Sequence, residues 1–250
     1  MKEYNINSQV PRIGDRAEIL ASWYLRFNGF FVVPNFILHD AGLAKQAGGQ
    51  LSEADLLAIR MPHEHEVIKK GDGMKINVQQ DQILDLTAQM MDFVIGEVSS
   101  KRCKFNWMDT KSQNVNQEYL EYALRRFGWW GDPSEISAIL AKRKRSEAID
   151  EKVGITTRIR LLSFGNYINP NLKGILQITF QDVLQYMKEG LFMSYGKDKK
   201  LKKIVSDHKQ WDPLICQVYR KLLGHKVIEQ TVAEVLAWLF PGVNAAKLRS

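Results

Sequence analysis

The sequence has few cysteines, no long apolar run and no phosphate-binding glycine loop, and each absence excludes a class of protein. Its two cysteines, Cys103 and Cys216, can form neither a disulfide framework nor a four-cysteine zinc site. No stretch approaches the roughly 18 apolar residues that span a bilayer, and the first residues lack the apolar core of a secretory signal. No G-x-x-x-x-G-K-[ST] motif occurs, which argues against an ATP-driven motor. We therefore expect a soluble, cytoplasmic protein that makes no membrane contact.

What the chain does contain is a sizeable apolar fraction and an uneven charge. Hydrophobic residues make up 45% of its 250 residues, which is enough to build a core. Residues 1–100 hold 9 Lys and Arg against 13 Asp and Glu, whereas residues 101–250 hold 26 against 15. An acidic part beside a basic remainder suits an enzyme that binds a divalent cation and holds a polyanion. A solvated basic surface is the alternative explanation.

Hydrophobic periodicity predicts an α/β protein. Runs of β-branched and aromatic residues predict strands at 30–38, 54–61, 92–102, 157–165 and 175–180. Apolar residues at helical spacing predict helices at 14–28, 116–130 and 181–192. Pro34 indicates a bulge or an edge position in the first strand, and 39–53 and 63–85 are expected to be loops or insertions. We expect one domain over 1–195, followed by a basic helical extension over 196–250.

Two carboxylates on adjacent predicted strands form the strongest candidate site. Glu97 shares a strand face with Phe93 and Ile95, and a carboxylate there is costly to bury unless it is paired or binds a metal. Asp55 begins the neighbouring strand and approaches Glu97 if the two strands pair. Two such carboxylates repel each other unless a cation joins them or one is protonated. Mg²⁺, with Mn²⁺ as an alternative, suits this arrangement and would activate a water for attack on phosphate. Surface residues at strand ends are the alternative explanation.

The order of these elements and carboxylates resembles the core of the PD-(D/E)xK nuclease superfamily. The matching pieces are Glu18 in AEILASWYL, Asp55 in SEADLLAI and Glu97 in DFVIGEVSSK. The resemblance covers roughly residues 14–165 and implies a restriction endonuclease-like αβββαβ core with a mixed central sheet. It implies metal-dependent hydrolysis of phosphodiester bonds, more often in DNA than in RNA. Asp55 and Glu97 would then be metal ligands, and Glu18 a further catalytic carboxylate.

The lysine of the superfamily motif is displaced in this sequence. Ser99 stands where the pattern has a lysine, two residues after Glu97, and the nearest lysine on that face is Lys101. Two positions along a strand span roughly 6.6 Å, which a lysine side chain can cover. We therefore expect Lys101 to assist catalysis. The alternative is a catalytically degenerate module of the same fold that binds nucleic acid or a protein partner.

Other residues are candidates for substrate contacts. Gln113 and Gln117 lie just before and within the second predicted helix, where some members of the superfamily carry a substrate-orienting glutamine, and Ser99 is a further candidate; helix capping is the alternative for the glutamines. Basic residues that can contact phosphates are Lys142, Arg143, Lys144, Arg145, Lys200 and Lys203. The expected partner is nucleic acid, DNA ahead of RNA. Homodimerisation and assembly into a larger complex stay open.

Overall fold

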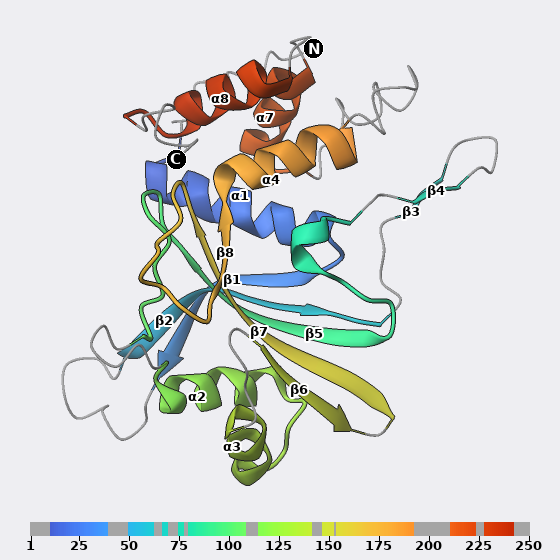
Figure 1. The fold of residues 1–250 in the computed structure, drawn as a ribbon, viewed down its shortest axis with the longest axis vertical. Helices are drawn as coiled ribbons and strands as arrows, with labels where there is room; N and C mark the ends of the chain where they lie inside the picture. Colours follow the sequence, from blue (N-terminus) through green and yellow to red (C-terminus); the bar gives the residue numbers. More distant parts are fainter. Residues whose placement is uncertain are drawn as a thin grey trace, which may run out of the picture.

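A mixed β-sheet with helices on both faces forms the body of the molecule (Figure 1). The computed structural model describes residues 11–39, 50–62, 67–69, 75–77, 80–108, 115–141, 147–152, 154–192, 211–223 and 228–242. The predicted α/β class is confirmed, with a sheet that combines antiparallel and parallel pairs. No helix within these ranges is long and apolar enough to cross a membrane.

The sheet has the strand order β1-β2-β5-β7-β6, and β8 also pairs with β7. Its strands are β1 (Phe31–His39), β2 (Gln50–Arg60), β5 (Met90–Val98), β6 (Glu147–Lys152), β7 (Ile155–Gly165) and β8 (Leu176–Thr179). β1, β2 and β5 form an antiparallel meander, whereas β7 is parallel to β5 and β8 is parallel to β7. The expected edge position of the strand with Pro34 is confirmed, because β1 lies at one end of this order.

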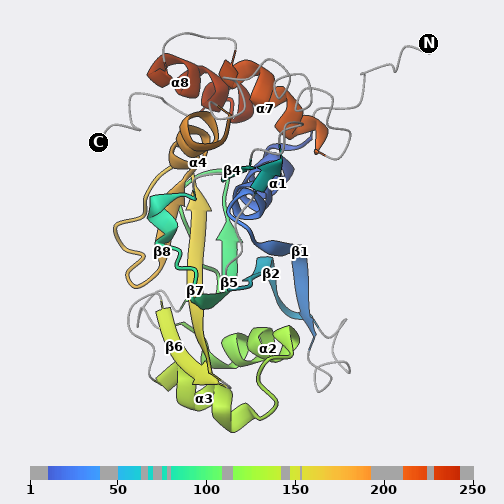
Figure 2. The same ribbon diagram turned by 90° about the vertical axis from the view of Figure 1, so that its right-hand side faces the viewer.

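Helices cover both faces of the sheet (Figure 2). On one face lie α1 (Ile13–Phe27), α4 (Phe180–Tyr186) with its π-helical continuation η3 (Met187–Phe192), α7 (Pro213–Leu223) and α8 (Ile228–Leu239). On the other lie α2 (Gln117–Phe127) and α3 (Pro133–Ala141). One apolar cluster joins α1 and α4 to α7 and α8, and a second joins α2 and α3 to the opposite face. The two C-terminal helices therefore share the core of α1.

The structure differs from the predicted boundaries at several points. β2 begins at Gln50 inside a predicted loop, and the predicted insertion contains β3 (Val67–Lys69), β4 (Lys75–Asn77) and η2 (Gln82–Leu84). Neither α3 nor β6 was predicted. The predicted strand over 92–102 is wrong at its end, because β5 stops at Val98.

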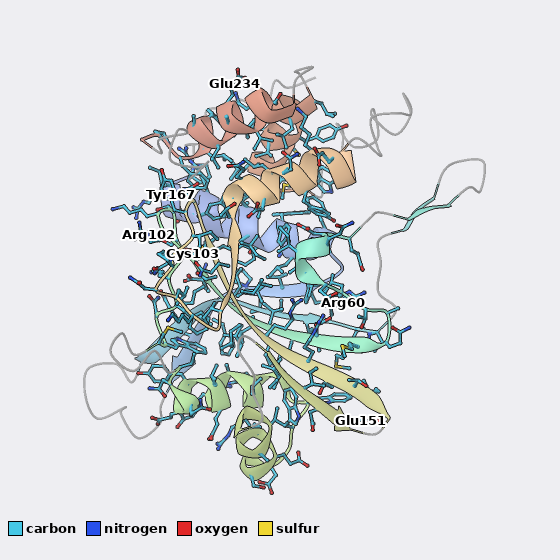
Figure 3. The ribbon with its side chains drawn as sticks, viewed as in Figure 1. Arg60, Arg102, Cys103, Glu151, Tyr167 and Glu234 are labelled. Atoms are coloured by element: carbon cyan, nitrogen blue, oxygen red, sulfur yellow. The ribbon has the colours of Figure 1, made fainter. Side chains whose placement is uncertain are left out.

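β5 ends early because the chain turns to run beside the end of β7. The Ser99 N–H still donates to the Phe164 carbonyl at 2.9 Å, but the Cys103 N–H donates to the Tyr167 carbonyl at 2.8 Å. Figure 3 shows Arg102, Cys103 and Tyr167 together in this region. Gly165 permits the approach, since a Cβ atom there would lie 2.6 Å from the Cys103 nitrogen.

Three charged residues lie in register across the end of the sheet opposite to this turn. Arg60 on β2, Asp92 on β5 and Arg158 on β7 occupy paired positions and are all buried. The Arg158 Nε lies 2.6 Å from one Asp92 oxygen, and the nearest Arg60 nitrogen lies 3.7 Å from the other. One carboxylate thus compensates two buried guanidinium groups.

The same arginines hold the segment that leads into β5. Arg60, labelled in Figure 3, donates to the Thr87 carbonyl at 2.9 Å, and Arg158 donates to the Asp85 carbonyl at 3.0 Å. Arg160 donates to the Leu84 carbonyl. Neutralising Asp92 would therefore disturb both the sheet and this segment.

We expect Asp92→Asn to destabilise the protein by about 3–5 kcal/mol, because it leaves two buried arginines without their shared counter-charge. Denaturant unfolding measures this change. Asp85→Asn is a matched control: the Asp85 side chain is 86% exposed and 3.9 Å from Arg158, and asparagine tolerates its left-handed backbone. The control should shift stability by no more than about 0.5 kcal/mol; equal effects of the two substitutions would contradict the argument.

Candidate active site

β2 and β5 separate at the positions of the two candidate carboxylates. Their backbone pairing stops at Leu56 and Gly96, so the next positions place Asp55 opposite Glu97. Beyond that point the Val98 N–H donates to the Asp55 Oδ2 at 2.6 Å. A side chain thus takes the place of the neighbouring strand's backbone. This hydrogen bond fixes the Asp55 carboxylate at the fork between the two strands.

Glu97 is a buried carboxylate that lacks compensation. It is fully buried, and neither of its oxygens accepts a hydrogen bond from the described part of the chain. Burial, and then the charge of Asp55, raise the pKa of Glu97 to about 8. Lys104 and the approaching backbone N–H of Asn106 oppose this rise, although the N–H does not reach full hydrogen-bonding geometry. The ionised form is therefore poorly stabilised.

The other two carboxylates are perturbed by the same surroundings. Burial raises the pKa of Asp55, while the Val98 N–H and Lys104 lower it. Burial, and then the charge of Asp55, raise the pKa of Glu18 on the half-buried edge of α1, and a hydrogen bond from the Asn35 side chain opposes this. The structure thus brings the three predicted carboxylates from α1, β2 and β5 into one electrostatic environment.

Asp55 and Glu97 belong to a polar row that crosses the sheet. Glu97 pairs with Ser163 on β7, and Ser163 pairs with Gln177 on β8. On the other side of Asp55, Asn35 occupies the opposing position of β1 and has a left-handed φ of 51°. One polar residue therefore stands at the same level on each of five strands. Asp55, Glu97 and Ser163 are buried, and because buried strand positions are normally apolar, these three need a chemical reason.

Lys104 is a functional candidate that the sequence analysis missed. It lies in the segment after β5, of which Cys103, Phe105 and Trp107 pack into the core beneath α2. Lys104 is exposed, and its charge lowers the pKa of both Asp55 and Glu97. The alternation of apolar and polar residues after the strand was the available signal.

The position of Lys104 is set by hydrogen bonds on its backbone. The Ser163 hydroxyl donates to the Lys104 carbonyl at 2.6 Å, and the Asn169 amide donates to the Cys103 carbonyl at 3.2 Å. The Trp107 indole, further along, donates to the Glu53 carbonyl of β2 at 3.2 Å. The segment is therefore tied to β2, to β7 and to the loop after β7.

Lys101 and Ser99 do not share a strand face with Glu97, so that expectation is wrong. Both follow the end of β5, and the Lys101 N–H donates to the Ser99 hydroxyl at 3.2 Å within this turn. Lys101 is exposed. Their roles in catalysis and substrate orientation stay predictions.

Of the remaining predicted residues, the structure describes Gln117 alone. Gln117 is exposed at the first position of α2, and its amide donates to the Val115 carbonyl at 3.3 Å, in keeping with a local structural role. The candidates that lie outside the described residues are Gln113, Lys142, Arg143, Lys144, Arg145, Lys200 and Lys203.

The donor set fits a hard cation that takes few protein ligands. Within the described ranges, no group of three or more His, Cys, Asp or Glu side chains is arranged to hold a metal ion. Asp55 and Glu97 supply two carboxylates, and Glu97 has unused oxygens. Mg²⁺ is commonly held by one or two carboxylates together with waters and substrate phosphates. The pair thus fits Mg²⁺ or Mn²⁺ and would not enclose a metal fully.

Comparisons with known proteins assign neither a family nor a function to this chain. The chain matches no known protein family, no curated protein and no solved structure. Fold and site together define an α/β protein with a buried carboxylate pair at the fork of two strands, and the functional argument rests on these residues.

We expect the metal-free protein to lose stability as the pH rises from about 5 to 8. The pKa of Glu97 is 4.5 in a free side chain and about 8 when folded. Below the lower value Glu97 therefore adds no pH dependence to stability, and between the two values the free energy of unfolding falls by about 1.4 kcal/mol per pH unit. Thermal unfolding in EDTA measures this slope.

Glu97→Gln should remove most of that slope and stabilise the metal-free protein at pH 8. The matched control is Glu118→Gln on the exposed side of α2, which should keep the wild-type slope. A slope unchanged in Glu97→Gln would show that Glu97 is ionised in the folded protein across this range.

Proposed function

We propose that this protein is a metal-dependent nuclease that hydrolyses phosphodiester bonds, in DNA ahead of RNA. The observation that carries the proposal is the buried, unpaired Glu97 opposite Asp55 at the strand fork. The order α1, β1, β2, β5, α2, β7, with β7 parallel to β5, also corresponds to the αβββαβ core implied by the resemblance to PD-(D/E)xK nucleases.

Asp55 and Glu97 would hold the metal ion through their oxygens. When bound, the ion supplies a water of lowered pKa and a positive charge beside the phosphate. Asp55 is pre-positioned by the Val98 N–H, whereas Glu97 must first lose its proton. Glu18 lies near enough to Asp55 for the Asp55 charge to raise its pKa. Its carboxylate can orient a water on the side of α1.

Lys104 is the lysine best placed to act on the phosphate. Its charge already reaches both carboxylates, and its exposed side chain can contact a phosphate oxygen as negative charge develops there. The water oxygen would form the new bond to phosphorus while the bond to the leaving oxygen breaks and that oxygen takes up a proton. Lys101, the candidate from the sequence, is the alternative for this role.

The one thiol near the site is unsuited to catalysis. Cys103 is buried, its thiol lies 3.6 Å from the Ser163 carbonyl, and burial raises its pKa to about 11. A thiol with so high a pKa is neither a good nucleophile nor a good metal ligand at neutral pH. The oxygen ligands therefore carry the proposed chemistry.

Substitutions in the site should show whether Lys104 or Lys101 assists cleavage. Asp55→Asn and Glu97→Ala should reduce Mg²⁺-dependent cleavage of mixed DNA and RNA substrates to background. Lys104→Ala should lower the cleavage rate by about 10²–10³-fold, because it removes a charge that stabilises the transition state. Lys101→Ala is the matched control and should stay within a few-fold of wild type. A larger loss of cleavage rate in Lys101→Ala than in Lys104→Ala would assign this role to Lys101. Binding of nucleic acid without cleavage under all conditions would favour the catalytically degenerate module.

Cleavage should require a metal ion and should increase with pH up to about 8. Mg²⁺ must displace the proton of Glu97, whose pKa is about 8 without metal, so below that value its apparent affinity falls up to about tenfold per pH unit. EDTA should abolish cleavage, and Mg²⁺ or Mn²⁺ should restore it. Titrating Mg²⁺ at several pH values tests this; an affinity that is flat between pH 6 and 8 would contradict the role of Glu97.

A further inference from the structure

A groove of about 680 Å³ opens next to Lys104. Its lining residues come from the segment after β5 and from the loop between β7 and β8: Lys104, Phe105, Asn106, Met108, Asn169, Asn171, Leu172 and Lys173. Lys104 and Asn106 also border Glu97, because both act on its pKa. The groove and the candidate active site therefore share Lys104 and Asn106.

The two walls of the groove are tied together by polar side chains. The Asn169 amide donates to the Cys103 carbonyl at 3.2 Å, which ties the loop after β7 to the segment after β5. Gln177 holds the second wall: its amide donates to the Asn169 and Leu172 carbonyls, each at 3.0 Å, and its oxygen accepts the Asn169 N–H at 2.7 Å. Gln177 is also the β8 member of the polar row. The row thus joins the carboxylate pair to the groove wall.

The chemistry of the lining suits a phosphate backbone with unpaired bases. Lys104 and Lys173 are exposed cations, and no carboxylate is found among the residues that line the groove in the described part of the chain. The exposed side chains of Asn106 and Asn171 each offer a donor and an acceptor, as base edges require. The volume lies within the range of small-ligand pockets, so the groove itself can hold a few nucleotides at most.

We infer that this groove binds a single strand of nucleic acid next to the phosphate that is cleaved. The inference rests on the proposed function and specifies its substrate: unpaired strands, or the unpaired ends of duplexes. Lys173 would contact a phosphate, and Asn171 would contact a base edge. Lys104, at the junction, would contact the phosphate that reaches the carboxylates.

Binding in EDTA tests the inference without any requirement for cleavage. Fluorescence anisotropy of short labelled single-stranded DNA, single-stranded RNA and duplex DNA would be measured with the full chain carrying Glu97→Gln. Single strands should bind more tightly than duplex. Adding Lys173→Ala should weaken binding to all sequences and lower the dependence of log affinity on log salt by about one. Adding Asn171→Ala should weaken binding by about tenfold for some bases and less for others.

Lys221→Ala is the control, because this exposed lysine lies on α7, over Trp238 and among the outer helices. It should leave the affinity and its salt dependence unchanged. Duplex binding as tight as single-strand binding, or Lys173→Ala with wild-type affinity, would overturn the inference. If the inference failed in this way but cleavage were still metal-dependent, the proposed function would not be contradicted. Groove-dependent binding of single strands without metal-dependent cleavage would support the groove and contradict the proposed hydrolysis.

Discussion

The burial of Glu97 without a partner is the constraint on which the site depends. The sheet buries charged side chains near both of its ends, but their neighbours differ in sign. At one end Asp92 lies between Arg60 and Arg158, so each charge has a counter-charge in register. At the other end Glu97 faces Asp55, a like charge, and has no hydrogen bond within the described chain. The first arrangement stabilises the fold, whereas the second is costly without a cation, and such a cost is typical of functional sites.

The fork between β2 and β5 follows from the route of the chain after β5. Gly165 lets the residues after Ser99 cross close to β7, and the segment that follows contacts β7 at Lys104 and β2 at Trp107. The indole N–H of Trp107 donates a hydrogen bond to the Glu53 carbonyl of β2. Because the backbone groups at the fork are satisfied by side chains, the strands can stay apart there. The opening, the lysine and the groove therefore have one structural cause.

Local patterns allowed much of this structure to be predicted. Helix and strand periods identified α1, α2 and the meander, and the cost of an isolated carboxylate on a strand identified Asp55 and Glu97. α3 was missed although Asp132 before Pro133 is a start signal: its carboxylate accepts the Ser134 N–H at 2.7 Å. β6 was missed because EAIDEK is mostly polar, as an outer strand can be. Lys104 could not be found by assuming a straight strand, since its place depends on a turn made through contacts with β7.

The charges of the site also couple the binding of the cation to that of the substrate in the proposed reaction. Glu18, Asp55 and Glu97 lie in one environment, and the lysine that acts on both Asp55 and Glu97 is Lys104. With the carboxylates ionised, a phosphate approaching them meets more negative than positive charge and is repelled. A divalent cation reverses this balance, and the phosphate oxygens in turn supply ligands that two carboxylates leave open. Cation and strand should therefore each strengthen the binding of the other at the carboxylates, while the groove, which has its own lysine, holds the neighbouring nucleotides without the cation.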